Sequence, residues 1–202
     1  GTYKGAGDFW LSNTSLGESE AITVIMRKSW NDINFMTAYT NMDTSDVYAL
    51  TSAQAESAYG YMQRWDGENV SSASSSYMAE HKFMATLDYT AQWFGNNDTR
   101  FSLVFIRKSG EPYSVTFDEP GYNSVTGNSR FYADYSLPYI PTGASDPNVS
   151  FTSSAVADAV MAHVNATGLS AYKGTYAPRN AFNSPWISRL DLRVTQDIKV
   201  FD

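Results

Sequence analysis

The run from His81 to Lys108, HKFMATLDYTAQWFGNNDTRFSLVFIRK, decides the fold. Every second residue in its first half is mostly apolar or aromatic: His81, Phe83, Ala85, Leu87, Tyr89, Ala91 and Trp93. The residues between them are mostly polar. A period of two predicts a β-strand with unlike faces. What covers each face distinguishes a soluble β-sandwich from a wall that spans a membrane.

The same alternation predicts five strands, at about residues 19–29, 33–42, 80–94, 99–108 and 187–201. Two connections are short and rich in turn formers, as hairpins require: Trp30-Asn31-Asp32 and Gly95-Asn96-Asn97-Asp98. The other two are long and cover about 43–79 and 109–186. Alternate links of an antiparallel up-and-down sheet emerge at the same end. The sequence therefore predicts an all-β fold with a short-turn end and a long-loop end.

This asymmetry is typical of outer-membrane barrels, which have short periplasmic turns and long extracellular loops. Strand length agrees, since roughly 9–11 tilted residues cross the hydrocarbon. Trp30, Trp93 and Phe94 flank the short turns, as in an interfacial aromatic girdle. Soluble antiparallel sheets also alternate, so the sandwich stays an alternative. About eight strands are needed to close a membrane barrel. The membrane interpretation therefore makes this chain a fragment of a larger barrel.

The membrane interpretation assigns the two faces of the strands. Ten apolar residues are expected to face lipid: Ile22, Val24, Phe35, Phe83, Leu87, Phe101, Leu103, Phe105, Leu190 and Leu192. Six charged residues are expected to line the lumen or contact a plug: Lys82, Asp88, Arg100, Arg189, Asp191 and Arg193.

Composition excludes several kinds of site. The net charge is −7 and no basic block occurs, which argues against a nucleic-acid partner. There is no cysteine, and two histidines cannot build a His-rich metal site, so no metal or cofactor is predicted. The first ten residues, GTYKGAGDFW, lack the pattern of a signal peptide. No run of roughly 18 apolar residues predicts a transmembrane helix.

The first long connection offers aromatic candidates for ligand binding. Tyr59, Tyr61 and Trp65 could stack on a sugar or a peptide. The alternative is that they pack against other loops, because aromatic side chains dominate packing in general.

The second long connection contains a helical pattern. Val156, Val160 and Val164 recur at every fourth residue, which predicts a surface helix that buries one stripe. Ser153 or Ser154 is the expected N-cap and Gly168 the expected stop.

Scattered acids in this connection leave calcium binding open: Asp118, Glu119, Asp134 and Asp146. They lack the D-x-D-x-D-G spacing of a calcium loop. The sequence also lacks G-x-S-x-G, H-E-x-x-H, P-loop and G-x-G-x-x-G motifs. No catalytic residue is singled out, and the chain is not expected to be an enzyme.

Several segments resemble one family. Residues 177–201, APRNAFNSPWISRLDLRVTQDIKVF, resemble late barrel strands of TonB-dependent outer-membrane receptors of the Oar-like (OmpA-related) group. In that group a P-R-N-x-x-x-x-P-W segment precedes a strand reading L-D-L-R-x-x-Q. RKSGEPYSVTF at 107–117 and YIPTGASDPNVSF at 139–151 are similar to further segments of the group, as is the strand that begins at His81. The matches occur in the family's order and span about residues 8–201.

The resemblance implies the C-terminal part of a plugged barrel of about 22 strands. The family takes up scarce ligands across the bacterial outer membrane, and some Oar-like members handle proteins or peptides. The implied partners are outer-membrane lipid, the remaining strands and plug of the same receptor, and the TonB complex. No plug domain or TonB box is recognised within 1–202, so TonB would be contacted through a missing N-terminal part. The alternative function is a secreted β-sandwich that binds glycans or acts in adhesion.

Overall fold

A computed structural model of the chain describes residues 12–48, 52–66, 71–117 and 135–198. Of residues 55, 56 and 59 only the backbone is described. The chain divides into two compact units. The sheet unit comprises Ser19–Thr44, Tyr77–Glu111 and Asn183–Asp202, and the loop unit comprises Gly1–Glu18, Ser45–Ser76 and Pro112–Phe182.

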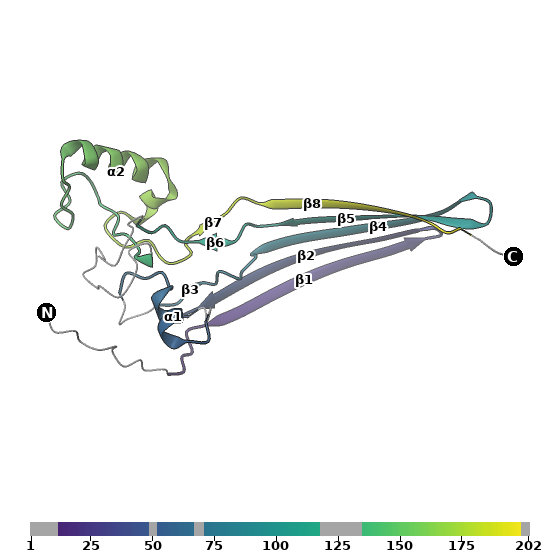
Figure 1. The fold of residues 1–202 in the computed structure, drawn as a ribbon, viewed down its shortest axis with the longest axis horizontal. Coiled ribbons are helices and arrows are strands. Elements are labelled where there is room, and N and C mark those ends of the chain that lie inside the picture. The colour runs from purple at the N-terminus through teal and green to yellow at the C-terminus, as the bar shows by residue number, and fades with distance from the viewer. Residues whose placement is uncertain (1–11, 49–51, 67–70, 118–134, 199–202) are drawn as a thin grey trace. The chain divides into compact units, whose positions relative to one another are not determined.

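The sheet unit is built from five long antiparallel strands in the order β1-β2-β4-β5-β8 (Figure 1). The strands are β1 (Glu18–Trp30), β2 (Ile33–Asp46), β4 (His81–Phe94), β5 (Asn97–Lys108) and β8 (Ile187–Gln196). All five predicted strands are therefore confirmed. β2 extends four residues beyond its predicted end at residue 42, and β8 ends at Gln196 rather than at residue 201. Residues 199–202 lie outside the described part.

The two short links are tight turns. Asn31 and Asp32 join β1 to β2, and Asn31 has a φ of 31°, a conformation that asparagine tolerates. Gly95 and Asn96 join β4 to β5, where Phe94 pairs with Asn97 and Gly95 has a φ of 67°. A glycine is suited to this position because it has no Cβ to clash at positive φ. A register shift between Ala91 and Phe94 bends β4 just before this turn.

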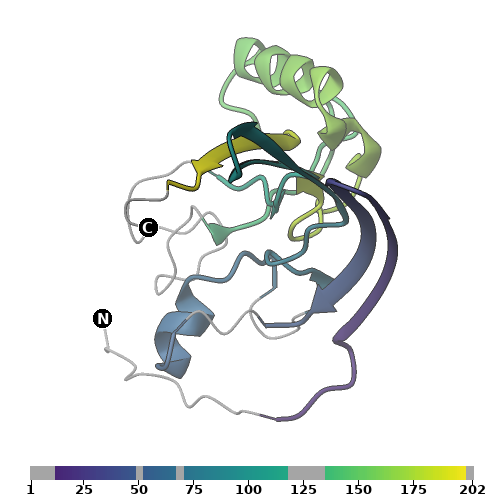
Figure 2. The same ribbon diagram turned by 90° about the vertical axis from the view of Figure 1, so that its right-hand side faces the viewer.

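The described strands form an open, curved sheet (Figure 2). β1 and β8 are its edges, and no further strand of the described residues pairs with either of them outside this order. The only other sheet in the described part of the chain joins β6 (Pro112–Tyr113) to β7 (Phe182–Asn183), with two residues in each strand. The architecture is therefore antiparallel and predominantly β, with up-and-down order in the main sheet.

Where β5 ends, the chain runs against the segment that leads into β8. A Cβ on Gly110 would overlap the carbonyl oxygen of Ser184, so this position accepts only glycine without a backbone shift. The Ser184 N–H donates to the carbonyl oxygen of Glu111 at 3.0 Å. This close approach fixes the start of β8 and with it the position of Trp186.

Besides β6 and its main helix, the loop unit has a small core and further short helical or extended elements. These are α1 (Ala55–Gly60), β3 (Ala73–Ser74), which pairs with the end of β2, and the 3₁₀ helix η2 (Gly168–Tyr172). The main helix is α2 (Ser154–Ala166). The core of the loop unit comprises the buried residues Ile140, Val164, Leu169 and Ala177, with Val115, Val160, Tyr172 and Phe182 packed around them.

Helix α2 confirms one prediction and corrects another. Ser153 is the N-cap and its hydroxyl accepts a hydrogen bond from the Val156 N–H at 3.3 Å. The helix ends before Gly168, as predicted. The buried stripe, however, includes Ala157 and Val164 rather than Val156, which is exposed. The prediction was wrong for Val156 because a spacing of three and four residues follows the helix surface more closely than a spacing of four throughout.

Candidate functional site

One face of the main sheet is apolar and uncovered. The strand register sets Phe35, Leu87, Leu103 and Leu192 side by side in one row across four strands. The next rows are Thr37, Ala85, Phe105 and Leu190 on one side and Ile33, Tyr89, Phe101 and Val194 on the other. Paired residues of neighbouring strands share a face. The register therefore places the predicted lipid-facing residues of β2, β4, β5 and β8 on a single surface.

Strand β1 continues this surface. The hydroxyls of Thr23 and Thr40 are 2.9 Å apart, and those of Ser19 and Thr44 are 2.8 Å apart. Thr40 is aligned with Lys82 on the opposite, polar face. Because side chains alternate along a strand, Ile22 and Val24 then lie on the apolar face.

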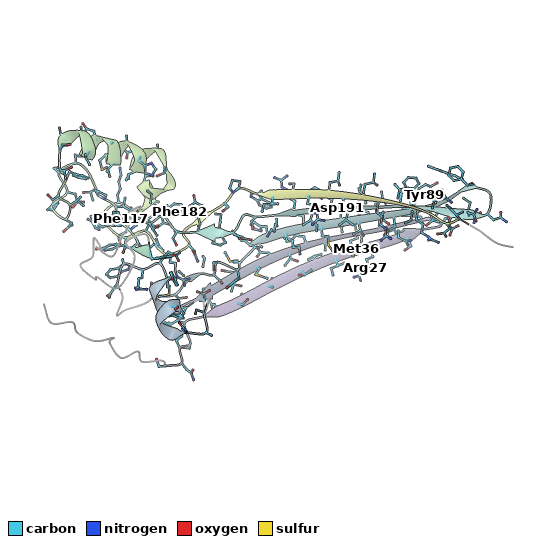
Figure 3. All side chains as sticks on the ribbon, viewed as in Figure 1. Arg27, Met36, Tyr89, Phe117, Phe182 and Asp191 are labelled. Atoms are coloured by element: carbon cyan, nitrogen blue, oxygen red, sulfur yellow. The ribbon has the colours of Figure 1, made fainter. Side chains whose placement is uncertain are left out.

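The apolar face is exposed to an unusual degree. Ile22 is 70% exposed and Leu192 is 66% exposed. Six of the ten predicted lipid-facing residues are exposed, and the four on the inner strands β2 and β5 are half-buried between their neighbours. Figure 3 shows side chains projecting from both sides of the long strands. Monomeric soluble proteins rarely leave a large contiguous apolar patch open, so this face indicates an interaction surface.

The opposite face carries the six predicted lumen residues, but it is not uniformly polar. Asp88 is aligned with Ser102 and Arg193, and its carboxylate accepts from the Ser102 hydroxyl at 2.6 Å. Arg189 and Asp191 form an ion pair at 2.8 Å. Between these charges the same face also carries the apolar residues Met36, Met84, Val104 and Ile106. The structure places all six charged residues on one surface, and it brings Arg189 and Asp191 into contact.

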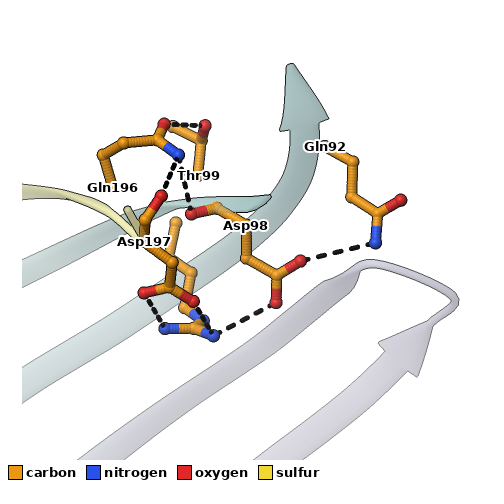
Figure 4. Close-up of polar contacts among 6 residues, drawn as sticks. Gln92, Asp98, Thr99, Gln196 and Asp197 are labelled. Atoms are coloured by element: carbon orange, nitrogen blue, oxygen red, sulfur yellow. Dashed lines mark hydrogen bonds and ion pairs between the residues drawn. The ribbon is translucent and has the colours of Figure 1, made fainter. Parts of the chain in front are cut away.

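A polar network lies at the short-turn end of this face (Figure 4). Arg100 donates to both carboxylate oxygens of Asp197, at 3.2 and 2.9 Å, and to Asp98 at 3.1 Å. The Gln196 amide donates to the backbone carbonyl oxygens of Asp98 and Asp197 at 3.3 and 2.8 Å. The network joins the β4–β5 turn to the end of β8. Sequence reasoning singled out Arg100 but missed its partners, because the pairing of β5 with β8 depends on a connection of about eighty residues.

The loop unit contains a pocket of about 270 Å³. Trp65 lies at its wall and stacks on Tyr176, with ring centroids 4.8 Å apart and an angle of 17° between planes. Trp65 is 45% exposed, so the stack leaves much of the indole accessible. The other lining residues are Gln63, Arg64, Asp66, Ser71, Leu137, Thr175, Ala177, Pro178 and Arg179.

The three predicted aromatic candidates have different surroundings. Trp65 lines the pocket. Tyr61 packs edge-on against Tyr135 at 5.6 Å, which agrees with the packing alternative. The side chain of Tyr59 lies outside the described residues. Sequence reasoning missed Tyr176, which is more than a hundred residues from Trp65 and belongs to no recognisable motif.

Arg179, which lines the pocket, also forms a largely buried ion pair. Its guanidinium is 6% exposed and lies 2.7 Å from the Asp46 carboxylate, and it also donates to the Asp46 carbonyl oxygen. The adjacent Asn180, with a φ of 56°, donates from its side chain to the Ser74 carbonyl oxygen at 2.7 Å. These contacts tie residues 179 and 180 to the end of β2 and to β3, so they hold the loop unit together.

The carboxylate of Asp146 is held by hydrogen bonds within the loop unit. Its carboxylate accepts from the backbone N–H groups of Thr142 and Asn148, at 2.8 and 2.9 Å, and from the hydroxyls of Thr142 and Tyr139. The Thr142 N–H, then that of Asn148, lower the pKa of Asp146 to about 2. Its oxygens are thus engaged by donors of the protein. Asp118, Glu119 and Asp134 lie outside the described residues, and among those described no cluster of three or more His, Cys, Asp or Glu could hold a metal ion.

In the part of the chain that the structure describes, no helix has the length and apolar character needed to cross a bilayer. Comparisons with protein families, with curated proteins and with solved structures found no match.

Proposed function

We propose that this chain forms part of the barrel wall of a TonB-dependent outer-membrane receptor, which takes up a peptide-, protein- or glycan-related ligand across the bacterial outer membrane. The observation that carries the proposal is the uncovered apolar face of the main sheet, opposite a face that carries charges. Its role is structural and conductive, and no residue is assigned to catalysis.

Strand dimensions support a membrane-spanning wall. The five strands have 10 to 14 residues, against roughly 9–11 that a tilted strand needs to cross the hydrocarbon. In water, each large apolar side chain left exposed forgoes roughly 1.5–3 kcal/mol of burial free energy. Lipid contact would remove that cost for the whole face at once.

The open edges support a place in a larger barrel. β1 has thirteen residues, all of them exposed, and it is an edge of the described sheet. A long unpaired edge invites pairing with another strand. In hydrocarbon an unpaired backbone group costs several kcal/mol, which is why membrane sheets close. We therefore expect further strands of the same receptor to pair with both edges.

The sandwich alternative requires a second sheet over the apolar face. Within the described residues the other sheet has two residues in each strand, which is too small to cover five long strands. A sandwich could still form with a separate chain, and the experiment distinguishes that outcome. The pocket at Trp65 suits a ligand-contacting role in the extracellular loops under the receptor proposal.

The test is made on the full-length protein extracted in detergent from its native source. Its mobility on an SDS gel is compared before and after boiling, and the band is identified by mass spectrometry. We expect a heat-dependent shift and peptides from a plug upstream of this chain. A band of about 22 kDa whose mobility does not change on boiling, recovered from the aqueous fraction, would exclude the receptor and favour the secreted sandwich.

A further inference from the structure

At the long-loop end the apolar face is capped by a cluster of polar and aromatic side chains. Trp186 lies at its centre, immediately before β8. The His81 ring stacks on the Trp186 ring at 5.8 Å with an angle of 8°, and the Arg107 guanidinium lies over the Trp186 ring at 5.2 Å. The Tyr39 hydroxyl is 2.9 Å from Nδ1 of His81. The cluster joins β2, β4 and β5 to the start of β8.

Arg107 belongs to the apolar face and not to the charged one. It is aligned with Phe83 on β4 and with Ser188 on β8, and Phe83 packs on Tyr39 at 4.6 Å. Among the residues that β2, β4, β5 and β8 present on this face, Arg107 is the only lysine or arginine. On β1 the same face carries Lys28, which lies over Trp30 at 5.8 Å at the hairpin end. Cations on this face therefore occur beside a tryptophan.

The guanidinium of Arg107 has an aromatic partner in place of a carboxylate. Arg100, Arg179 and Arg189 each pair with an aspartate. Of the ion pairs between described residues none includes Arg107, and its side chain is exposed. Its N–H donors are consequently available to a ligand, while the ring holds the guanidinium in place. Arginine presents planar, paired donors that match phosphate oxygens.

The position of Arg107 along the strand matches the edge of a hydrocarbon layer. Arg107 is eight positions along the strand from Thr99, where hydrogen bonding between Thr99 and Gln196 ends the apolar rows. At a rise of about 3.3 Å per residue this distance is about 26 Å along the strand, or about 20 Å at a tilt of about 40°. The apolar band of a transmembrane barrel is about 25 Å tall. A wall centred in this band sets the backbone of Arg107 just inside its edge, and the long arginine side chain reaches from there to the lipid headgroups.

We propose that Arg107, held by Trp186 and His81, binds the phosphate of an anionic lipid headgroup in the leaflet at the long-loop end. This inference rests on the proposed membrane wall. It adds a specific lipid site to a surface that otherwise has only hydrocarbon contacts. Trp186 supplies an amphipathic ring suited to the interface, and Arg107 supplies the charge.

The test uses the full-length protein reconstituted in phosphatidylcholine bilayers. Electron paramagnetic resonance measures the motionally restricted fraction of spin-labelled phosphatidylglycerol and, separately, of spin-labelled phosphatidylcholine. We expect the protein to prefer phosphatidylglycerol and Arg107→Gln to reduce that preference about fivefold, the effect of about one surface cation. The matched control is Arg193→Gln, which removes the same charge from the opposite face and should leave the preference unchanged.

Each outcome has a separate meaning. Equal preference in the protein and in Arg107→Gln, with an unchanged number of restricted lipids, overturns the lipid site and leaves the wall intact. If inorganic phosphate abolishes the preference and sulfate at equal ionic strength does not, the site binds a soluble phosphate group and the lipid assignment is wrong. Absence of any restricted lipid, in the protein and in both variants, contradicts the proposed function itself.

Discussion

The sheet unit and the loop unit differ in where they place their apolar side chains. The loop unit buries Ile140, Val164 and Leu169 in a small core and satisfies its buried charges locally, as with Arg179 and Asp46. The sheet unit leaves large apolar side chains such as Ile22 and Leu192 exposed, on a face that none of its described residues covers. The loop unit therefore buries apolar side chains and pairs buried charges as a protein surrounded by water does. The apolar side chains of the sheet unit are removed from water only if something apolar lies against that face.

The largest effect is expected when a charge is placed on the apolar face of the sheet. Leu103→Arg should destabilise the folded protein in bilayers by up to about 4 kcal/mol, because Leu103 is in the middle row. The free energy of unfolding is measured by denaturant titration in lipid vesicles. Val104→Arg is the control, since its neighbouring position points to the face that carries Asp191. Equal losses for both variants would mean that the two faces have the same surroundings.

In the loop unit the largest effect is expected from the buried ion pair. Arg179→Met leaves the Asp46 carboxylate without its partner and should cost about 3 kcal/mol, because removing one partner strands the other charge. The change is read from urea unfolding followed by tryptophan fluorescence. Arg193→Met, at an exposed position, serves as the control and should change stability by less than about 0.5 kcal/mol. A loss below that limit for Arg179→Met would show that specific polar contacts do not hold this unit together.

A smaller effect is expected at the start of α2. Ser153→Ala removes the hydroxyl that accepts from the Val156 N–H and should cost about 1 kcal/mol. Hydrogen exchange of the first turn of α2 should accelerate accordingly. Ser154→Ala is the matched control, because Ser154 is inside the helix and is not its N-cap. If Ser154→Ala has the larger effect, the cap has been assigned to the wrong serine.

A further expected effect depends on pH. The pKa of Asp146 is lowered to about 2 from an ordinary value of 3.8, chiefly by the Thr142 and Asn148 N–H groups. Its carboxylate therefore stabilises the loop unit fully above about pH 4, and this contribution is lost as the pH falls through about 2. The difference in melting temperature between the protein and Asp146→Asn should be present at pH 6 and disappear toward pH 2. A difference that persists unchanged at pH 2 contradicts the assignment.

The sequence predicted the sheet unit well because successive side chains of a strand point to opposite faces, so a sheet with one apolar face carries a period of two. Each predicted strand is present, and the face of Leu103 follows from alternation alone. Register could not be predicted between β5 and β8, so the network of Arg100 with Asp197 was missed. In the loop unit, the contacts of Arg179 with Asp46 and of Trp65 with Tyr176 join residues that are more than a hundred positions apart. Local sequence patterns contain no information on such pairs. Within α2, the pattern also failed to predict that Val156 is exposed, because the neighbours that cover one side of the helix are distant in sequence.

The central claim is that the two faces of the sheet contact different media, and site-directed spin labelling along β5 tests it most directly. The chain contains no cysteine, so single cysteines at residues 101 to 106 of the full-length protein can be labelled one at a time. In bilayers, labels at 101, 103 and 105 should be accessible to oxygen, and labels at 102, 104 and 106 to a water-soluble relaxation agent. Labels at 101, 103 and 105 that are shielded from both agents would mean that protein covers the apolar face. That result would contradict a lipid-facing wall.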